Sequence, residues 1–294
     1  MRAWVFKRLL GSKGSGGTGI PLEIDTVIPD EALRPGGLLR VEIVLRAPDR
    51  DVVVRTVNVK LVANTSPAVG KQDVVDTESG DTFAHFPVTS SFTVSKGQER
   101  RVPLRFRLRW ESPVSEVRGE QLDGVRLGVY TFVEAGGISG RTDSDPLRIG
   151  ATPLHEAVLD AFAAAGYSCR SAKIDDEYIP RTERQMLYMR QSFRLVDTSA
   201  VTGPDRPQQL EVNFHTNAVG SEIYVRKAAL HQKDWWMKPP VLRYVAAHHE
   251  AGHVDFEARV RQWIDEVAVL PEKAVDDRER VEYDLGSPRV WIDT

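Results

Sequence analysis

The chain has 294 residues, of which 41% are hydrophobic and 28% are charged, and its formal net charge at pH 7 is -3. This composition is typical of a globular protein with a buried core and excludes a disordered or fibrous chain. Because Lys and Arg are scattered among Asp and Glu and the chain is slightly acidic, nucleic acid is not expected as a partner.

The length of the chain favours two domains, since single domains usually have about 100 to 200 residues. The single cysteine, Cys169, cannot form an internal disulfide, so a cytoplasmic location is expected. The basic start, MRAWVFKRLLG, is interrupted by Lys7 and Arg8 and leads to no small-residue cleavage site, so no secretory signal is predicted. No apolar run approaches the roughly 18 residues of a membrane span.

Residues 1–19 are predicted to be a basic N-terminal segment followed by a flexible Gly/Ser linker, GSKGSGGTG. The run from Gly14 to Gly19 matches the dinucleotide-binding pattern G-x-G-x-x-G. That pattern functions after a strand and at the start of a helix, whereas this run precedes the strand-like IPLEIDTVI. We therefore predict a linker and no cofactor.

Residues 20–150 are predicted to form an antiparallel β-sandwich. The turn-forming residues 35–37, Pro-Gly-Gly, precede a strand in which Leu39, Val41, Ile43 and Leu45 alternate with polar residues. Further short strands are indicated at 22–28, 57–61, 83–88, 92–94, 102–108 and 127–132. Such a series without a long intervening helix is typical of a sandwich.

Residues 151–268 are predicted to form a second β-sandwich with a helix at each end. The opening helix runs from Pro153, suited to a first turn, to Gly166, suited to a C-terminal cap. Strands are indicated at 192–195, 209–215, 222–230 and 241–248. The closing helix begins at Asp255, which can cap it, and its apolar face comprises Phe256, Val260, Trp263, Ile264 and Val267. Residues 269–294 are predicted to be a charged tail.

The sharpest enzymatic signal is His249-Glu250-Ala251-Gly252-His253, which matches the H-E-x-x-H zinc motif of metalloproteases. The motif requires a continuous helix, because only then do both imidazoles face the metal while the glutamate activates a bound water. A strand-like segment precedes it and the amphipathic helix begins after it, so we predict a strand-to-helix connector. The alternative function is a zinc-dependent hydrolase using His249, Glu250 and His253.

Two other candidates for chemistry have simpler interpretations. Asp175, Asp176 and Glu177 match a cation site or a carboxylate pair, but such a run is more often a solvated hairpin turn. Cys169 has no flanking signature of a nucleophile, so a structural thiol is expected. We therefore predict no catalytic, cofactor-binding or metal-binding residues.

Two segments favour binding of a protein partner. Trp235, Trp236 and Met237 lie beside turn-forming prolines, as an exposed recognition patch would, although they also suit the end of the second sandwich. Trp4 and Phe6 belong to a basic and apolar N-terminal segment that suits a partner groove or weak contact with an anionic membrane. Its alternatives are packing on the chain's own fold and disorder.

Several stretches resemble the bacterial sporulation-control proteins of the stage-zero M type, an arrestin-related family. The resemblance rests on IDTVIPDEALRPGGLLRVEIVLRAP, on a Trp-Glu-x-Pro segment (Trp110, Glu111, Pro113), on a Gly-Val-x-Thr strand at 128–131 and on TDSDPLRI. It spans residues 20–268 and is looser in the second half, where MLYMRQSFRL and the DWWMKPP loop depart from the family pattern.

The resemblance implies an all-β chain of two arrestin-like antiparallel β-sandwich domains, with a short helix opening the second domain and a helix at its C-terminus. It also implies a non-enzymatic regulatory scaffold or adaptor that acts through protein contacts in sporulation or cell-division control. Exposed edges of sandwich sheets offer a physical route to such contacts, because they can pair with an incoming strand. The identity of the protein partner and the oligomeric state stay unassigned.

Overall fold

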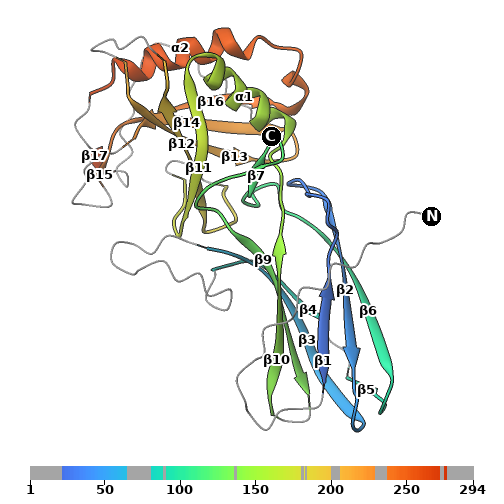
Figure 1. Ribbon diagram of the computed structural model, residues 1–294. Coiled ribbons are helices and arrows are strands. Elements are labelled where there is room, and N and C mark those ends of the chain that lie inside the picture. Colours follow the sequence, from blue (N-terminus) through green and yellow to red (C-terminus); the bar gives the residue numbers. More distant parts are fainter. Residues whose placement is uncertain are drawn as a thin grey trace.

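The computed structural model describes residues 22–64, 81–88, 91–135, 138–179, 182, 184–199, 206–228, 237–271 and 275–276. Figure 1 shows a β-rich chain whose N-terminal half (residues 22–150) is built from long strands, with two helices at the far end of the C-terminal half (residues 151–276). No helix in these ranges is long and apolar enough to span a membrane.

The N-terminal half contains two antiparallel sheets. The three-stranded sheet has the order β1-β2-β6, and the five-stranded sheet has the order β10-β9-β3-β4 with β5 also paired to β3. The strands of the first sheet are β1 (Glu23–Val27), β2 (Leu38–Arg46) and β6 (Glu99–Arg107). Those of the second are β3 (Val52–Ala63), β4 (Asp81–Val88), β5 (Phe92–Val94), β9 (Leu127–Ala135) and β10 (Ile138–Leu147).

The two sheets pack face to face around an apolar core. On β2, Leu39, Val41, Ile43 and Leu45 are buried, as their alternation predicts. Contacts cross between the sheets: the rings of Phe86 and Phe106 stack with centroids 3.8 Å apart, and Thr26 donates to the Thr131 hydroxyl at 2.8 Å. These features agree with the predicted antiparallel sandwich.

The chain passes from one half to the other along residues 148–151. Leu33 forms a parallel bridge with Ile149 on one side of this segment, and Glu116 forms another with Gly150 on the other side. Glu116 belongs to a small hairpin of β7 (Glu116–Val117) and β8 (Glu120–Gln121). The connection is therefore held by backbone hydrogen bonds on both sides.

The C-terminal half contains one five-stranded antiparallel sheet of order β11-β12-β13-β14-β16. Its strands are β11 (Tyr167–Asp175), β12 (Arg190–Asp197), β13 (Gln209–Thr216), β14 (Gly220–Lys227) and β16 (Val241–Ala247). No strand is predicted from the sequence at the position of β11. In the described part of this half, the only other sheet is the pair β15 (Met237–Lys238) and β17 (Val275–Asp276).

Two helices pack against one face of this sheet (Figure 1). Helix α1 (Pro153–Ala164) begins at Thr152, whose hydroxyl accepts from the His155 backbone N–H. Helix α2 (Phe256–Ala268) is capped by Asp255 and buries its whole predicted apolar face. Both predicted helices are confirmed. They occupy the sheet face on which the predicted second sandwich would place another sheet.

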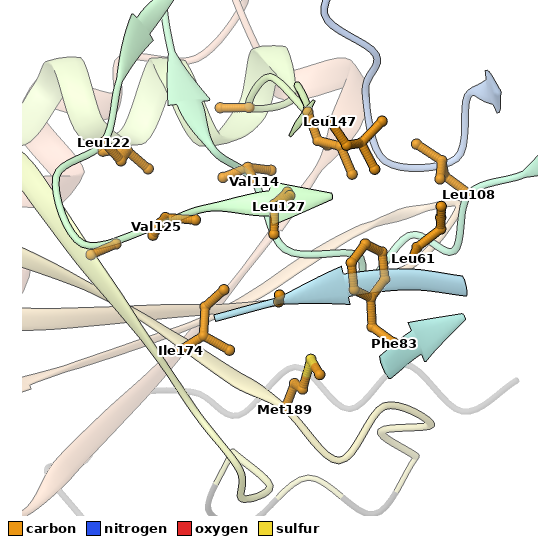
Figure 2. Packing of buried hydrophobic residues seen from close by; sticks show 14 of the residues in the cluster. Leu61, Phe83, Leu108, Val114, Leu122, Val125, Leu127, Leu147, Ile174 and Met189 are labelled. Carbon is orange, nitrogen blue, oxygen red and sulfur yellow. The ribbon is translucent and has the colours of Figure 1, made fainter. Parts of the chain in front are cut away.

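One hydrophobic cluster extends through both halves. Figure 2 shows Leu61 and Phe83 of the first half together with Ile174 and Met189 of the second. Because the apolar core continues across residue 150, packing does not mark a boundary there. The division into domains at 20–150 and 151–268 stays a prediction from the sequence.

Candidate functional site

Four of the five predicted partner-binding residues lie outside the described residues, namely Trp4, Phe6, Trp235 and Trp236. Met237 lies in β15, where its backbone pairs with Asp276 of β17. The assignment of these residues to a binding patch stays a prediction.

The segment His249–His253 is a strand-to-helix connector, as predicted. Strand β16 ends at Ala247, a single 3-10 turn, η1, covers His248–Glu250, and α2 begins only at Phe256. Gly252 has φ of 82°, a left-handed conformation that interrupts a right-handed helix. His249 and His253 therefore do not lie one turn apart on a continuous helix.

The carboxylate of Glu250 is already engaged by its own chain. It accepts from the Ala247 backbone N–H at 3.1 Å and pairs with Arg259 at 2.5 Å. Burial favours a higher pKa for Glu250, but these two partners outweigh it and hold the pKa below its usual value. Throughout the part of the chain that the structure describes, no three His, Cys, Asp or Glu side chains are placed to hold a metal ion.

The acidic run at 175–177 has a structural role, and the prediction of a solvated hairpin turn is wrong for two of its members. Asp175 is the last residue of β11, and it and Glu177 both pair with Arg190, whose side chain is fully buried. A buried guanidinium requires such partners, since an unpaired charge in the interior is costly.

Cys169 is partly buried on β11, and burial raises the pKa of its thiol to about 12. The thiolate is the nucleophilic form of cysteine, and it is scarce at neutral pH when the pKa is this high. The geometry agrees with the predicted structural thiol.

The most conspicuous polar cluster lies where the two halves meet. We call it the Glu111 junction and define it as Trp110, Glu111, His215 and Glu222. Glu111 follows the end of β6 and accepts hydrogen bonds at 2.8 Å from the backbone N–H groups of Met186 and Leu187. Its other oxygen lies 3.4 Å from Nε2 of His215 on β13. One carboxylate thus holds three distant parts of the chain together.

Trp110 reaches this place because Gly36 leaves room for it. A Cβ atom on Gly36 would come within 2.6 Å of the indole ring, and Gly36 has φ of +75°. On its other side, the indole ring lies 5.0 Å from the ring of His248, measured between centroids. The Trp-Glu-x-Pro segment that carries the family resemblance is therefore part of the connection between the halves.

His215 is held between two carboxylates, with Glu111 at 3.4 Å and Glu222 at 3.7 Å. Burial on its own lowers the pKa of a histidine, but Glu111 and Glu222 outweigh it and raise the pKa of His215 to about 9. Despite its own burial, Glu222 has a pKa lowered to about 2 by His215 and Arg243. At neutral pH the imidazole is positively charged, which suits an ion pair and not a general base.

The sheet face that includes His215 is polar although much of it is buried. Arg226 and Tyr224 of β14 are 1% and 0% exposed. Arg226 pairs with Glu211 at 2.6 Å, and Asn213 donates to the Ser192 hydroxyl at 2.8 Å. Burial raises the pKa of Glu211, but the neighbouring cations outweigh it and hold the pKa well below the usual range. A buried pair of charges is weak evidence for stability, because the cost of desolvation offsets much of the attraction between the charges.

The opposite face of the same sheet is apolar and carries the helices. His155 of α1 stacks on Phe214 with ring centroids 4.2 Å apart, and Trp263 of α2 stacks on Tyr244 at 4.4 Å. Burial lowers the pKa of His155 to about 3, so its imidazole is neutral. The sheet is thus covered on this face by helices.

The cavity beside the junction is small. Its volume is about 30 Å³ and its lining includes Glu111, His155 and His215. Such a volume holds about one water molecule and is far below the roughly 300 Å³ of a small-molecule site. The junction is therefore suited to connecting parts of the chain, not to enclosing a substrate.

Sequence reasoning did not find His215 or Glu222. Neither residue lies in a motif, and both occupy positions in strands where a polar side chain ordinarily faces solvent. Trp110 and Glu111 are named from the sequence, but only because they belong to the Trp-Glu-x-Pro segment that carries the family resemblance.

The comparisons with known proteins agree with one another. A model of the family described as SpoOM protein matches residues 6–227. The sporulation-control protein spo0M of Bacillus subtilis (strain 168) is 27% identical over 218 residues, which cover 74% of this chain and 78% of the relative. The crystal structure of Spo0M, sporulation control protein, from Bacillus subtilis matches with a TM-score of 0.66 and 20% identity. That match covers 84% of this chain and 99% of the solved chain.

The matched range of the family model includes all four residues of the Glu111 junction. It ends before the connector at 249–253. The histidines of the connector therefore lie beyond the matched range.

Proposed function

The chain belongs to the SpoOM protein family, and from that membership we propose that it is a non-enzymatic regulatory scaffold or adaptor. It acts through protein contacts in the control of sporulation or cell division, in a bacterial cytoplasm. The observation that carries the proposal is the relative in Bacillus subtilis, which is named a sporulation-control protein and is matched over most of both chains.

The geometry supports a binding protein. The Glu111 junction is occupied by its own ion pairs, and its cavity has room for about one water. Such a cluster holds the halves in one arrangement, which is what a scaffold needs to present a fixed surface. In this proposal the halves are the two arrestin-like domains that the family resemblance implies, at 20–150 and 151–268.

Deletion of the gene in its native bacterium, followed by complementation, tests this role. We expect the deletion to change the yield of heat-resistant spores or the timing of septation, and the full chain to restore it. A strain that sporulates and divides normally without the gene would contradict the proposal.

The non-enzymatic part of the proposal has its own control. A triple variant, His249→Ala with Glu250→Gln and His253→Ala, removes every residue of the zinc pattern. Because Glu250 also pairs with Arg259, an Arg259→Gln variant controls for loss of that contact. We expect the triple variant to complement as well as Arg259→Gln. Failure of the triple variant alone, together with stoichiometric zinc in the purified wild-type protein, would favour the hydrolase.

A further inference from the structure

The solvent-facing side of the sheet β1-β2-β6 carries many charges, and at one end they neutralise each other. Arg46 pairs with Glu99 at 2.7 Å, and Arg101 pairs with both Glu99 and Glu42, at 2.8 Å and 2.7 Å. All lie on the face opposite the buried Leu39, Val41, Ile43 and Leu45. This end of the sheet has its own complementary charges.

The other end of the same face carries arginines without complementary charges in the described part of the chain. Arg40 of β2 and Arg105 of β6 are directly opposite each other, and both are exposed. Within the described ranges, no carboxylate lies within ion-pair distance of either guanidinium. Like charges placed directly opposite in a sheet are destabilising, so the stability of the sheet does not explain this pair.

Protection of a sheet edge can explain Arg105 but not Arg40. Strand β6 is an edge strand, where Pro103 and Arg105 discourage pairing with another chain. Strand β2, however, lies between β1 and β6 and has no free edge. Edge protection therefore does not account for Arg40.

An exposed apolar cluster from the other half of the chain lies next to Arg109, four residues beyond Arg105. Arg109, two residues beyond β6, contacts the sulfur of Met186 at 3.5 Å. Met186 is 71% exposed, and Tyr178 and Tyr188 are 50% and 52% exposed. The two tyrosine rings pack edge to face at 4.8 Å. Side chains of this size are exposed together mainly at interaction sites.

This cluster is held in place by the Glu111 junction. The Glu111 carboxylate accepts from the backbone N–H groups of Met186 and Leu187, so Met186 and the neighbouring Tyr188 are tied to the chain just beyond β6. A surface that is already ordered loses little entropy when a partner binds.

We propose that Arg40, Arg105, Arg109, Tyr178, Met186 and Tyr188, the arginine–tyrosine surface, bind an acidic protein segment that also carries apolar side chains. This inference rests on the proposed function as a partner-binding protein and names the chemistry of the partner. The partner's carboxylates supply the charges that Arg40 and Arg105 lack. Its apolar residues cover Met186 and the two tyrosines.

The observations favour a protein over nucleic acid or a membrane. The chain as a whole has a net charge of -3, which opposes a polyanion once the ligand extends beyond the few arginines. The tyrosine rings pack on each other, whereas platforms for single-stranded nucleic acid present separate rings for stacking.

Selection from a random peptide library displayed on phage, with the full chain as bait, tests the proposal. We expect the enriched peptides to combine Asp or Glu with apolar residues, and their affinity to fall with rising salt. In the variant Arg40→Gln with Arg105→Gln, binding of these peptides should weaken about tenfold, measured by fluorescence anisotropy.

The matched control is Arg46→Gln with Arg101→Gln, which removes the same charge from the other end of the same sheet face. We expect it to change the affinity by less than about twofold. Met186→Ala with Tyr188→Ala tests the apolar part and should also weaken binding. Urea unfolding of each variant establishes that it is folded.

The proposal is overturned by enriched peptides without an acidic bias, or by an equal loss of affinity in the two arginine variants. It is also overturned if a single-stranded oligonucleotide or phosphatidylserine vesicles bind in an Arg40-dependent way and more tightly than the peptides. If Arg40→Gln with Arg105→Gln loses peptide binding yet fully complements the deletion strain, the surface binds acidic segments but is not needed for the proposed function. If deletion has no phenotype, the proposed function fails while peptide binding is still measurable.

Discussion

Replacing Glu111 with Gln is the most direct test of the junction. The change removes a charge that lies 3.4 Å from the His215 imidazole, where the two side chains are only 13% and 9% exposed. Breaking a buried ion pair typically costs about 3 to 5 kcal/mol, because one charge is left without a partner. Here 3.4 Å is long for a charged hydrogen bond, and Glu222 still faces the imidazole. We therefore expect a loss of about 2 kcal/mol.

Urea unfolding at neutral pH measures this loss, with Glu42→Gln as the matched control. Glu42 also pairs with one cation, Arg101 at 2.7 Å, but its side chain is 37% exposed. Exposed pairs contribute little, so the control should change the free energy of unfolding by at most about 0.5 kcal/mol. A double-mutant cycle with His215→Gln should give a coupling energy of about 1 kcal/mol or more. A Glu111→Gln variant as stable as Glu42→Gln, with no coupling, would refute the role of the junction.

Three further predictions concern the stability effects of single residues. The pKa of His215 is about 9 in the folded chain and 6.5 when unperturbed. Its contribution to stability is thus complete below pH 6.5 and is lost as the pH rises through 9. Unfolding across this range should show that loss in the wild type and not in His215→Gln. Burial, together with Asp143 and Asp25, raises the pKa of Asp145 to about 7, and one of its buried oxygens has no hydrogen-bond partner within the described chain. Asp145→Asn should therefore unfold at higher urea than the wild type at pH 8 and at a similar concentration at pH 3; equal midpoints at pH 8 would contradict this. Gly36→Ala should be more destabilising than Gly97→Ala by about 1 to 3 kcal/mol. Both glycines have positive φ, but only at Gly36 would an added Cβ meet a ring, that of Trp110. Similar urea midpoints for the two variants would exclude the close approach of the indole.

The parts of the fold that sequence reasoning predicted well are those with a strong local pattern. Helix α2 was predicted from Asp255 and five apolar positions at helical spacing, and all five are buried. The connector before it was predicted because a strand-like segment precedes the motif and the amphipathic helix begins after it. In both cases neighbouring residues carried the information.

The parts that were missed depend on contacts between distant residues. Strand β11, YSCRSAKID, has few large apolar residues, and its position is fixed by pairing with β12. Tyr224 and Arg226 alternate with Ile223 and Val225, a pattern in which the polar side normally faces water. They are buried because carboxylates on neighbouring positions, Glu222 and Glu211, accept their hydrogen bonds. No local pattern reveals that such partners will be in place.

The distribution of paired and unpaired charges links the fold to the proposed binding surface. Two buried cations have partners inside the molecule: Arg226 has Glu211, and His215 has two carboxylates. Buried charges need such partners because burying an isolated charge would cancel a large share of the free energy of unfolding of a domain. On the surface that cost is absent, so a chain can leave cations unneutralised where another molecule is to supply the anion. Arg40 and Arg105 are such a pair. Arg109, four residues beyond Arg105, contacts the exposed Met186, whose backbone the Glu111 junction holds in place. The same carboxylate that joins the halves thereby orders the apolar part of the surface, so loss of Glu111 should weaken peptide binding even though Glu111 itself is not part of that surface.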